Sequence, residues 1–131
     1  NNQTKNFNSQ TFDYPENCYG PFTISEIQKI DQAFKTEQKN TLLSHPSNVL
    51  FIKDILRNRI HIYQEKIKET SNIPLISSIS NNKDIKLDPI NFEETEFNPF
   101  IHNINFYAKS KLMFRIDSTD YIIVINSRFN R

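Results

Sequence analysis

Apolar and polar residues alternate most regularly near the end of the chain, over residues 112–126. Leu112, Phe114 and Ile116 are separated by single residues, and a second apolar stretch runs over residues 121–126. This alternation predicts two antiparallel strands joined by a tight turn. An even loop, of residues 118–119 or 117–120, places six large apolar side chains on one face. These are Leu112, Phe114, Ile116, Tyr121, Ile123 and Ile125.

The opposite face of this hairpin is also apolar, because it carries Met113, Ile122 and Val124 beside Arg115. A sheet face in water normally carries polar side chains, so something should cover these residues. The chain's own N-terminal arm or its 73–99 segment is one expected cover. A partner protein is the other, since exposed apolar patches mark interaction sites and arginine is enriched in interfaces. These four residues are therefore candidate partner-binding residues.

Helical periodicity dominates residues 23–71. Thr23 and Glu26 match a capping box, and the apolar steps that follow predict a helix from about residue 24 to 39, with Asn40 as its stop. A second stripe predicts a longer helix, with Ser47 as its N-cap and an end near residues 71–74. Charged residues are expected to cover much of its water-facing surface, among them Lys53, Asp54, Arg57 and Arg59. Together the two stripes predict an antiparallel helical hairpin. The stripes are Ile24, Ile27, Ile30 and Phe34, then Val49, Ile52, Leu56, Tyr63 and Ile67, widened by Ile55 and Ile60.

The remaining segments carry weaker signals. Residues 1–20 contain four aromatic side chains, which predict an irregular arm lying against the body of the protein. In the irregular segment 73–99, residues 73–79 suit a short helix or a strand, and Ile85 with Leu87 suits a short strand. This segment ends in an acidic loop at Glu93, Glu94 and Glu96. Residues 101–107 have side chains suited to a strand.

These elements predict an α+β fold in which an N-terminal helical hairpin packs on a small, mainly antiparallel sheet that ends in a C-terminal β-hairpin. We expect a single domain over residues 1–131. It consists of the arm (1–20), two helices (23–71), the irregular segment (73–99) and antiparallel strands (100–127). A chain of 131 residues is the size of one domain and can bury a core without metal or disulfides.

The charge balance and hydropathy narrow the range of partners. A net charge of +1 argues against nucleic-acid binding, which usually requires a basic excess. The longest apolar run, residues 121–125, is far shorter than a membrane span. The chain begins without methionine, which fits either a removed export signal or a trimmed terminus. A periplasmic or secreted location is favoured over a cytoplasmic one.

The sequence contains no recognisable catalytic, cofactor or metal site. Its single glycine, Gly20, effectively excludes phosphate-binding loops, which need several glycines. His45, His61 and His102 show no metal-ligand spacing. Cys18, the only cysteine, cannot form an intramolecular disulfide and matches no nucleophile signature. We expect no cofactor, and enzyme activity is disfavoured.

The function that these observations favour is a non-catalytic protein-binding module, such as a small exported bacterial inhibitor or immunity-type protein. It rests on the missing catalytic signature, the apolar second face of the hairpin, and the acidic residues Glu93, Glu94 and Glu96 as further candidate contacts. Two alternatives stay open. One is a structural subunit of a larger assembly, and the other is a small hydrolase or transferase that uses His102 or Cys18. Homo-oligomer formation also stays open.

Overall fold

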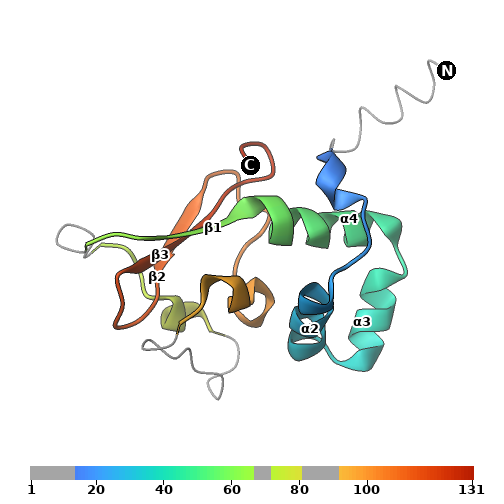
Figure 1. The fold of residues 1–131 in the computed structure, drawn as a ribbon, viewed down its shortest axis with the longest axis horizontal. Coiled ribbons are helices and arrows are strands. Elements are labelled where there is room, and N and C mark those ends of the chain that lie inside the picture. Colours follow the sequence, from blue (N-terminus) through green and yellow to red (C-terminus); the bar gives the residue numbers. More distant parts are fainter. Residues whose placement is uncertain (1–13, 67–71, 81–91) are drawn as a thin grey trace.

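The computed structural model describes residues 14–66, 72–80 and 92–131 (Figure 1). It confirms the α+β class: within these residues, three α-helices gather at one end of the molecule and a three-stranded antiparallel sheet lies at the other (Figure 1). The helices are α2 (Ile24–Ala33), α3 (Thr36–Leu43) and α4 (Pro46–Asp54), and the strands are β1 (Ile60–Gln64), β2 (Leu112–Arg115) and β3 (Tyr121–Ile125). Shorter turns are the π-helix η2 (Ile55–Arg59) and the 3-10 turns η1 (Glu16–Cys18), η3 (Ile76–Ile79), η4 (Glu94–Glu96) and η5 (Pro99–Ile101).

The C-terminal hairpin has the predicted register. Leu112 pairs with Ile125 and Phe114 with Ile123, and the Ile116 N–H donates to the Tyr121 carbonyl at 3.0 Å. Because side chains alternate between the two faces of a strand, this register places the predicted apolar residues on the face that packs into the core. The core of this face consists of Phe114, Ile116, Ile123 and Ile125, packed with Ile76, Phe97 and Ile104 from the connecting segments.

The predicted first helix is two helices. Its capping box is present, because the Thr23 hydroxyl accepts from the Glu26 N–H at 3.1 Å and the Glu26 carboxylate accepts from the Thr23 N–H at 2.9 Å. The prediction of one helix to residue 39 is wrong: Phe34 is extended, and the Lys35 N–H donates to the Gln38 side chain to start α3. Of the four residues of the predicted stripe only Ile30, at 1% exposed, is buried, whereas Phe34 is half-buried and Ile24 and Ile27 are exposed.

The second helix is also shorter than predicted. It starts at Pro46, with His45 at the N-cap position, and its π-helical turn ends at Arg59, after which the chain becomes β1. Pairing with β3 gives residues 60–64 a complete ladder of backbone hydrogen bonds on one side, and this tertiary pairing outweighs the helical spacing of the sequence. The third strand of the sheet is therefore β1, in place of the strand expected at residues 101–107.

Residues 98–107 form turns because their asparagines bond locally. Asn98 accepts from the Phe100 N–H at 3.1 Å and Asn105 accepts from the Tyr107 N–H at 3.0 Å, which competes with strand pairing. Of the two structures expected for residues 73–79, the short helix is present as η3. The strand expected at Ile85 and Leu87, and residues 1–13 of the arm, lie outside the described residues.

Several charged residues of α4 and η2 that were predicted to face water are buried. Lys53, Asp54 and Arg59 are 7%, 0% and 1% exposed, because the segment before α2 packs on one side of α4 and the C-terminal residues reach it as well. Both cations donate to carbonyls: Lys53 to Gly20 at 2.7 Å, and Arg59 to Asn126 through Nε and to Phe106 through Nη2, whereas its Nη1 has no hydrogen-bond partner among the described residues. Buried charges must be paired in this way to be tolerated.

Candidate functional site

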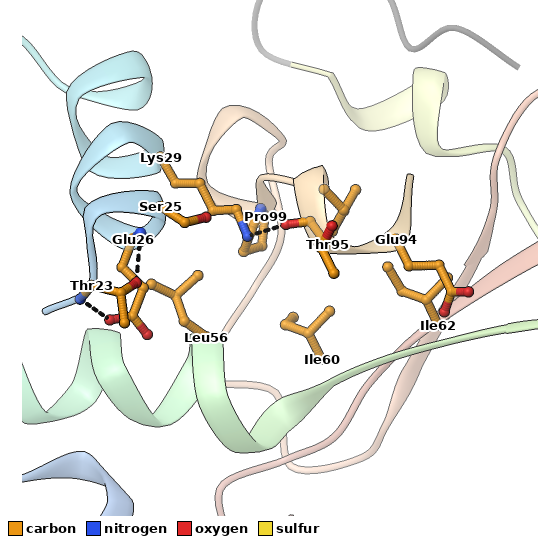
Figure 2. Close-up of a pocket in the computed structure, with 11 residues that line it drawn as sticks. Thr23, Ser25, Glu26, Lys29, Leu56, Ile60, Ile62, Glu94, Thr95 and Pro99 are labelled. Atoms are coloured by element: carbon orange, nitrogen blue, oxygen red, sulfur yellow. Dashed lines mark hydrogen bonds between the residues drawn. The ribbon is translucent and has the colours of Figure 1, made fainter. Parts of the chain in front are cut away.

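A cleft of about 370 Å³ opens where the helical end of the molecule meets the sheet (Figure 2). One wall is α2, the opposite wall is the chain around η4, and β1 with the preceding π-turn lies between them (Figure 2). The cleft is lined by Thr23, Ser25, Glu26, Lys29, Leu56, Ile60, Ile62, Glu94, Thr95, Phe97 and Pro99.

The α2 wall is held rigidly by an arginine fork. Arg57 donates to both carboxylate oxygens of Glu26, at 2.8 Å from Nε and 2.7 Å from Nη2. It also donates to the carbonyls of Pro21 and Asn17, so one guanidinium ties the start of α2 to the preceding chain. These bonds lower the pKa of Glu26, chiefly through Arg57. Glu26 therefore stays ionised and paired, which makes it a structural group and a poor proton donor.

The η4 wall is tied to α2 by two contacts. Lys29 Nζ donates to the Thr95 carbonyl at 2.8 Å across the cleft (Figure 2), and burial lowers the pKa of this amine. The buried Asn98 amide donates to the Lys29 carbonyl at 2.8 Å and to the Gln32 side chain at 3.0 Å. These hydrogen bonds, at Thr95 within η4 and at Asn98 two residues after it, fix the separation of the two walls.

The strand beside the cleft, β1, is an edge of the sheet, because the strand order is β1-β3-β2. Its ladder with β3 is bounded by the Asn126 N–H donating to the Arg59 carbonyl and the Glu65 N–H donating to the Asp120 carbonyl. Antiparallel hydrogen-bonded pairs recur every second residue, so residues 61 and 63 also bond to β3. The N–H and C=O groups of Ile60, Ile62 and Gln64 therefore point away from the sheet.

This outer edge of β1 has no backbone partner among the described residues. The other edge of the sheet differs. At β2, the Arg115 N–H donates to the Pro74 carbonyl at 2.9 Å, and Leu75 forms a parallel bridge with Arg115. The outer edge of β2 is thus partly covered, at Arg115, whereas that of β1 has no backbone partner in the described part of the chain, and Ile60 and Ile62 on it line the cleft.

The sheet separates the seven predicted partner-binding residues into two groups. Glu93, Glu94 and Glu96 are exposed, and Glu94 lines the cleft on the core side of β1. Met113, Arg115, Ile122 and Val124 lie on the opposite face, where Met113 pairs with Val124 and Arg115 with Ile122. Met113, Arg115 and Val124 are half-buried, and Ile122 is fully buried between its cross-strand neighbours Tyr63 and Arg115.

Sequence reasoning missed the residues that build the cleft. The segment 60–64 alternates Ile60 and Ile62 with His61 and Tyr63, which is a strand period of two, but the apolar spacing of the preceding helix concealed it. No sequence pattern marked Lys29 as a cleft residue, because Thr95, which it contacts, lies 66 residues further along the chain.

The residues named for a hydrolase or transferase are not brought into contact. Cys18 is buried against α4 and η2, where its sulfur lies 3.4 Å from the amide of Asn58 in η2, and burial, followed by the nearby Asp54, raises its pKa. His102 stacks on Phe97 with ring centroids 5.4 Å apart and lies 3.1 Å from the Ser80 hydroxyl, and burial lowers its pKa to about 4. A raised thiol pKa disfavours a nucleophile.

Within residues 14–66, 72–80 and 92–131, no group of three His, Cys, Asp or Glu side chains has the geometry to hold a metal ion. None of the helices described there is long and apolar enough to cross a membrane. No family model, curated protein or solved structure matches the chain. The site is thus defined by its own geometry: an open sheet edge beside a preformed, charged cleft in a small α+β domain.

Proposed function

We propose that this protein is a protein-binding module that receives an extended segment of a partner along the outer edge of β1. The observation that carries the proposal is the row of outward-facing backbone groups at Ile60, Ile62 and Gln64, next to a cleft whose walls are fixed. An edge strand is a ready template for another strand, and such strand addition supplies affinity through main-chain hydrogen bonds.

The chemistry of the cleft supports binding over catalysis. Two of its three charged lining side chains are engaged in fixed contacts, Glu26 with Arg57 and Lys29 with the Thr95 carbonyl, and the third, Glu94, is exposed. General acid–base work requires a group within reach of substrate whose proton can move near neutral pH, whereas Glu26 is held ionised. The partly exposed apolar side chains Ile60 and Ile62 offer a surface for an alternating side chain of a bound strand.

A displayed library of random eight-residue segments tests this proposal, with the 131-residue chain as the target. The test variant is Gln64→Pro, because Gln64 is exposed and its N–H points outward, so proline removes an edge donor without touching the ladder. The matched control is Glu37→Gln, an exposed position on α3.

The proposal expects enriched peptides that bind the wild-type chain and the Glu37→Gln variant equally, and that bind Gln64→Pro at least about tenfold more weakly. Failure to enrich any peptide would overturn it. Enriched peptides that bind the Gln64→Pro variant as tightly as the wild-type chain would overturn it as well.

A further inference from the structure

We infer that the segment received along β1 is basic, and that it places a lysine or arginine beside Glu94 and an apolar side chain two residues away beside Ile60. This inference rests on the function proposed above and specifies the partner of the same site. It is argued from the charge around the cleft and from the alternation of side chains along a strand.

The cleft has an unbalanced negative charge. Around it the described residues supply four carboxylates and two cations, a balance of −2: Glu26, Glu93, Glu94, Glu96, Lys29 and Arg57. Both cations are engaged, Arg57 by the fork to Glu26 and Lys29 by the Thr95 carbonyl.

The three carboxylates at η4 remain open to a ligand. Glu93, Glu94 and Glu96 are exposed, and none forms an ion pair with another described residue. Glu96 is close enough to Lys29 to act on it electrostatically, which leaves Glu94 as the carboxylate that lines the cleft itself. A cation in the bound segment is the complement that this surface lacks.

The position of the basic residue follows from strand geometry. Side chains of a strand paired with β1 alternate between the cleft side, with Ile60 and Ile62, and the opposite side, with His61 and Tyr63. In Figure 2, Glu94 and Ile62 both lie toward the end of the cleft away from α2, and Leu56 lies toward α2. Of two cleft-facing side chains of the partner, two residues apart, one therefore meets Leu56 and Ile60 next to the α2 wall, and the other meets the exposed Glu94 at the opposite end.

The strand itself limits the length of the contact. The five residues of β1 extend over about 17 Å at roughly 3.4 Å per residue. A segment of about five to seven residues is enough to use all three outward-facing positions of β1. The recognised unit is thus a short motif of the form apolar-any-basic, read in either chain direction.

The test uses individual peptides recovered from the library selection, each compared with a version whose lysines and arginines are changed to glutamine. We expect the neutral versions to bind at least about fivefold more weakly. On the protein side, Glu94→Gln should weaken binding of the basic peptides about two- to fivefold, and the double variant Glu94→Gln, Glu96→Gln should weaken it further. The control Glu37→Gln, which removes the same charge from α3, should leave binding unchanged. Both effects should shrink in high salt.

Two failures can be told apart. Peptides that lose affinity for the Gln64→Pro variant but are indifferent to their own charge and to Glu94→Gln would overturn the basic motif and leave strand addition standing. Peptides that are basic but bind Gln64→Pro unchanged would overturn strand addition at β1, and with it this inference.

Discussion

The orientation of β1 can be tested with two prolines that are three residues apart. His61 and Gln64 are both exposed on the same strand, but their N–H groups point in opposite directions. The N–H of residue 61 belongs to the ladder with β3, and that of residue 64 faces outward. Comparing His61→Pro with His61→Ala, and Gln64→Pro with Gln64→Ala, removes the side-chain contribution at each site and leaves the effect of losing one N–H.

The expected magnitudes differ because only one proline breaks a bond. At residue 61, proline deletes a ladder hydrogen bond and leaves the Val124 carbonyl without its donor, which costs about 1–3 kcal/mol. At residue 64 the cost is about 0–0.5 kcal/mol, since proline is tolerated on an edge strand and reduces the entropy of the unfolded chain. For 131 residues, 1–3 kcal/mol corresponds to a fall in Tm of about 4–11 °C.

Thermal and urea unfolding of the four variants, followed by circular dichroism, provides the measurement. A large loss for His61→Pro relative to His61→Ala, with little change for Gln64→Pro relative to Gln64→Ala, is the expected result. Equal losses at both positions would refute the reasoning, because they would mean that the outer edge of β1 is already paired in the folded protein.

Three further predictions concern buried groups. Glu26→Gln should lower the free energy of unfolding at pH 7 by about 1–3 kcal/mol, because it breaks the Arg57 fork. The folded pKa of Glu26 is depressed below 4.5, so the stability that its carboxylate contributes is present above that pH and is lost on acidification. If the Glu26→Gln variant lost as much stability below pH 4.5 as the wild-type chain does, this assignment would be contradicted. The pKa of His102 falls from 6.5 to about 4 on folding, so stability should decrease as pH falls from 6.5 to 4, by up to about 1.4 kcal/mol per pH unit. Urea titrations at several pH values should show this slope disappear in His102→Gln and persist in the exposed control His45→Gln. Cys18, buried with a raised pKa, should react with a thiol reagent at pH 7.5 at least about a hundredfold more slowly in the folded chain than in urea, and a fast folded-state reaction would show that η1 opens readily.

Several local features could be predicted from the sequence, because neighbouring residues determine them. The register of the C-terminal hairpin follows from a side-chain period of two, which allows one parity to place Phe114, Ile116 and Ile123 on the same face. The start of α2 follows from the reciprocal bonds of Thr23 and Glu26, which are three residues apart.

The tertiary structure decided what contacts distant in sequence determine. Residues 60–64 continue a helical apolar spacing, and their pairing with residues 121–125 makes them a strand because the ladder satisfies their backbone groups. Asp54 and Arg59 appear from the pattern to be solvated, and the chain segments that fold over α4 bury them. The cleft has the same origin. Lys29, Ile62 and Glu94 lie on three separate parts of the chain, and their meeting at an open edge depends on how the helices and the sheet pack together.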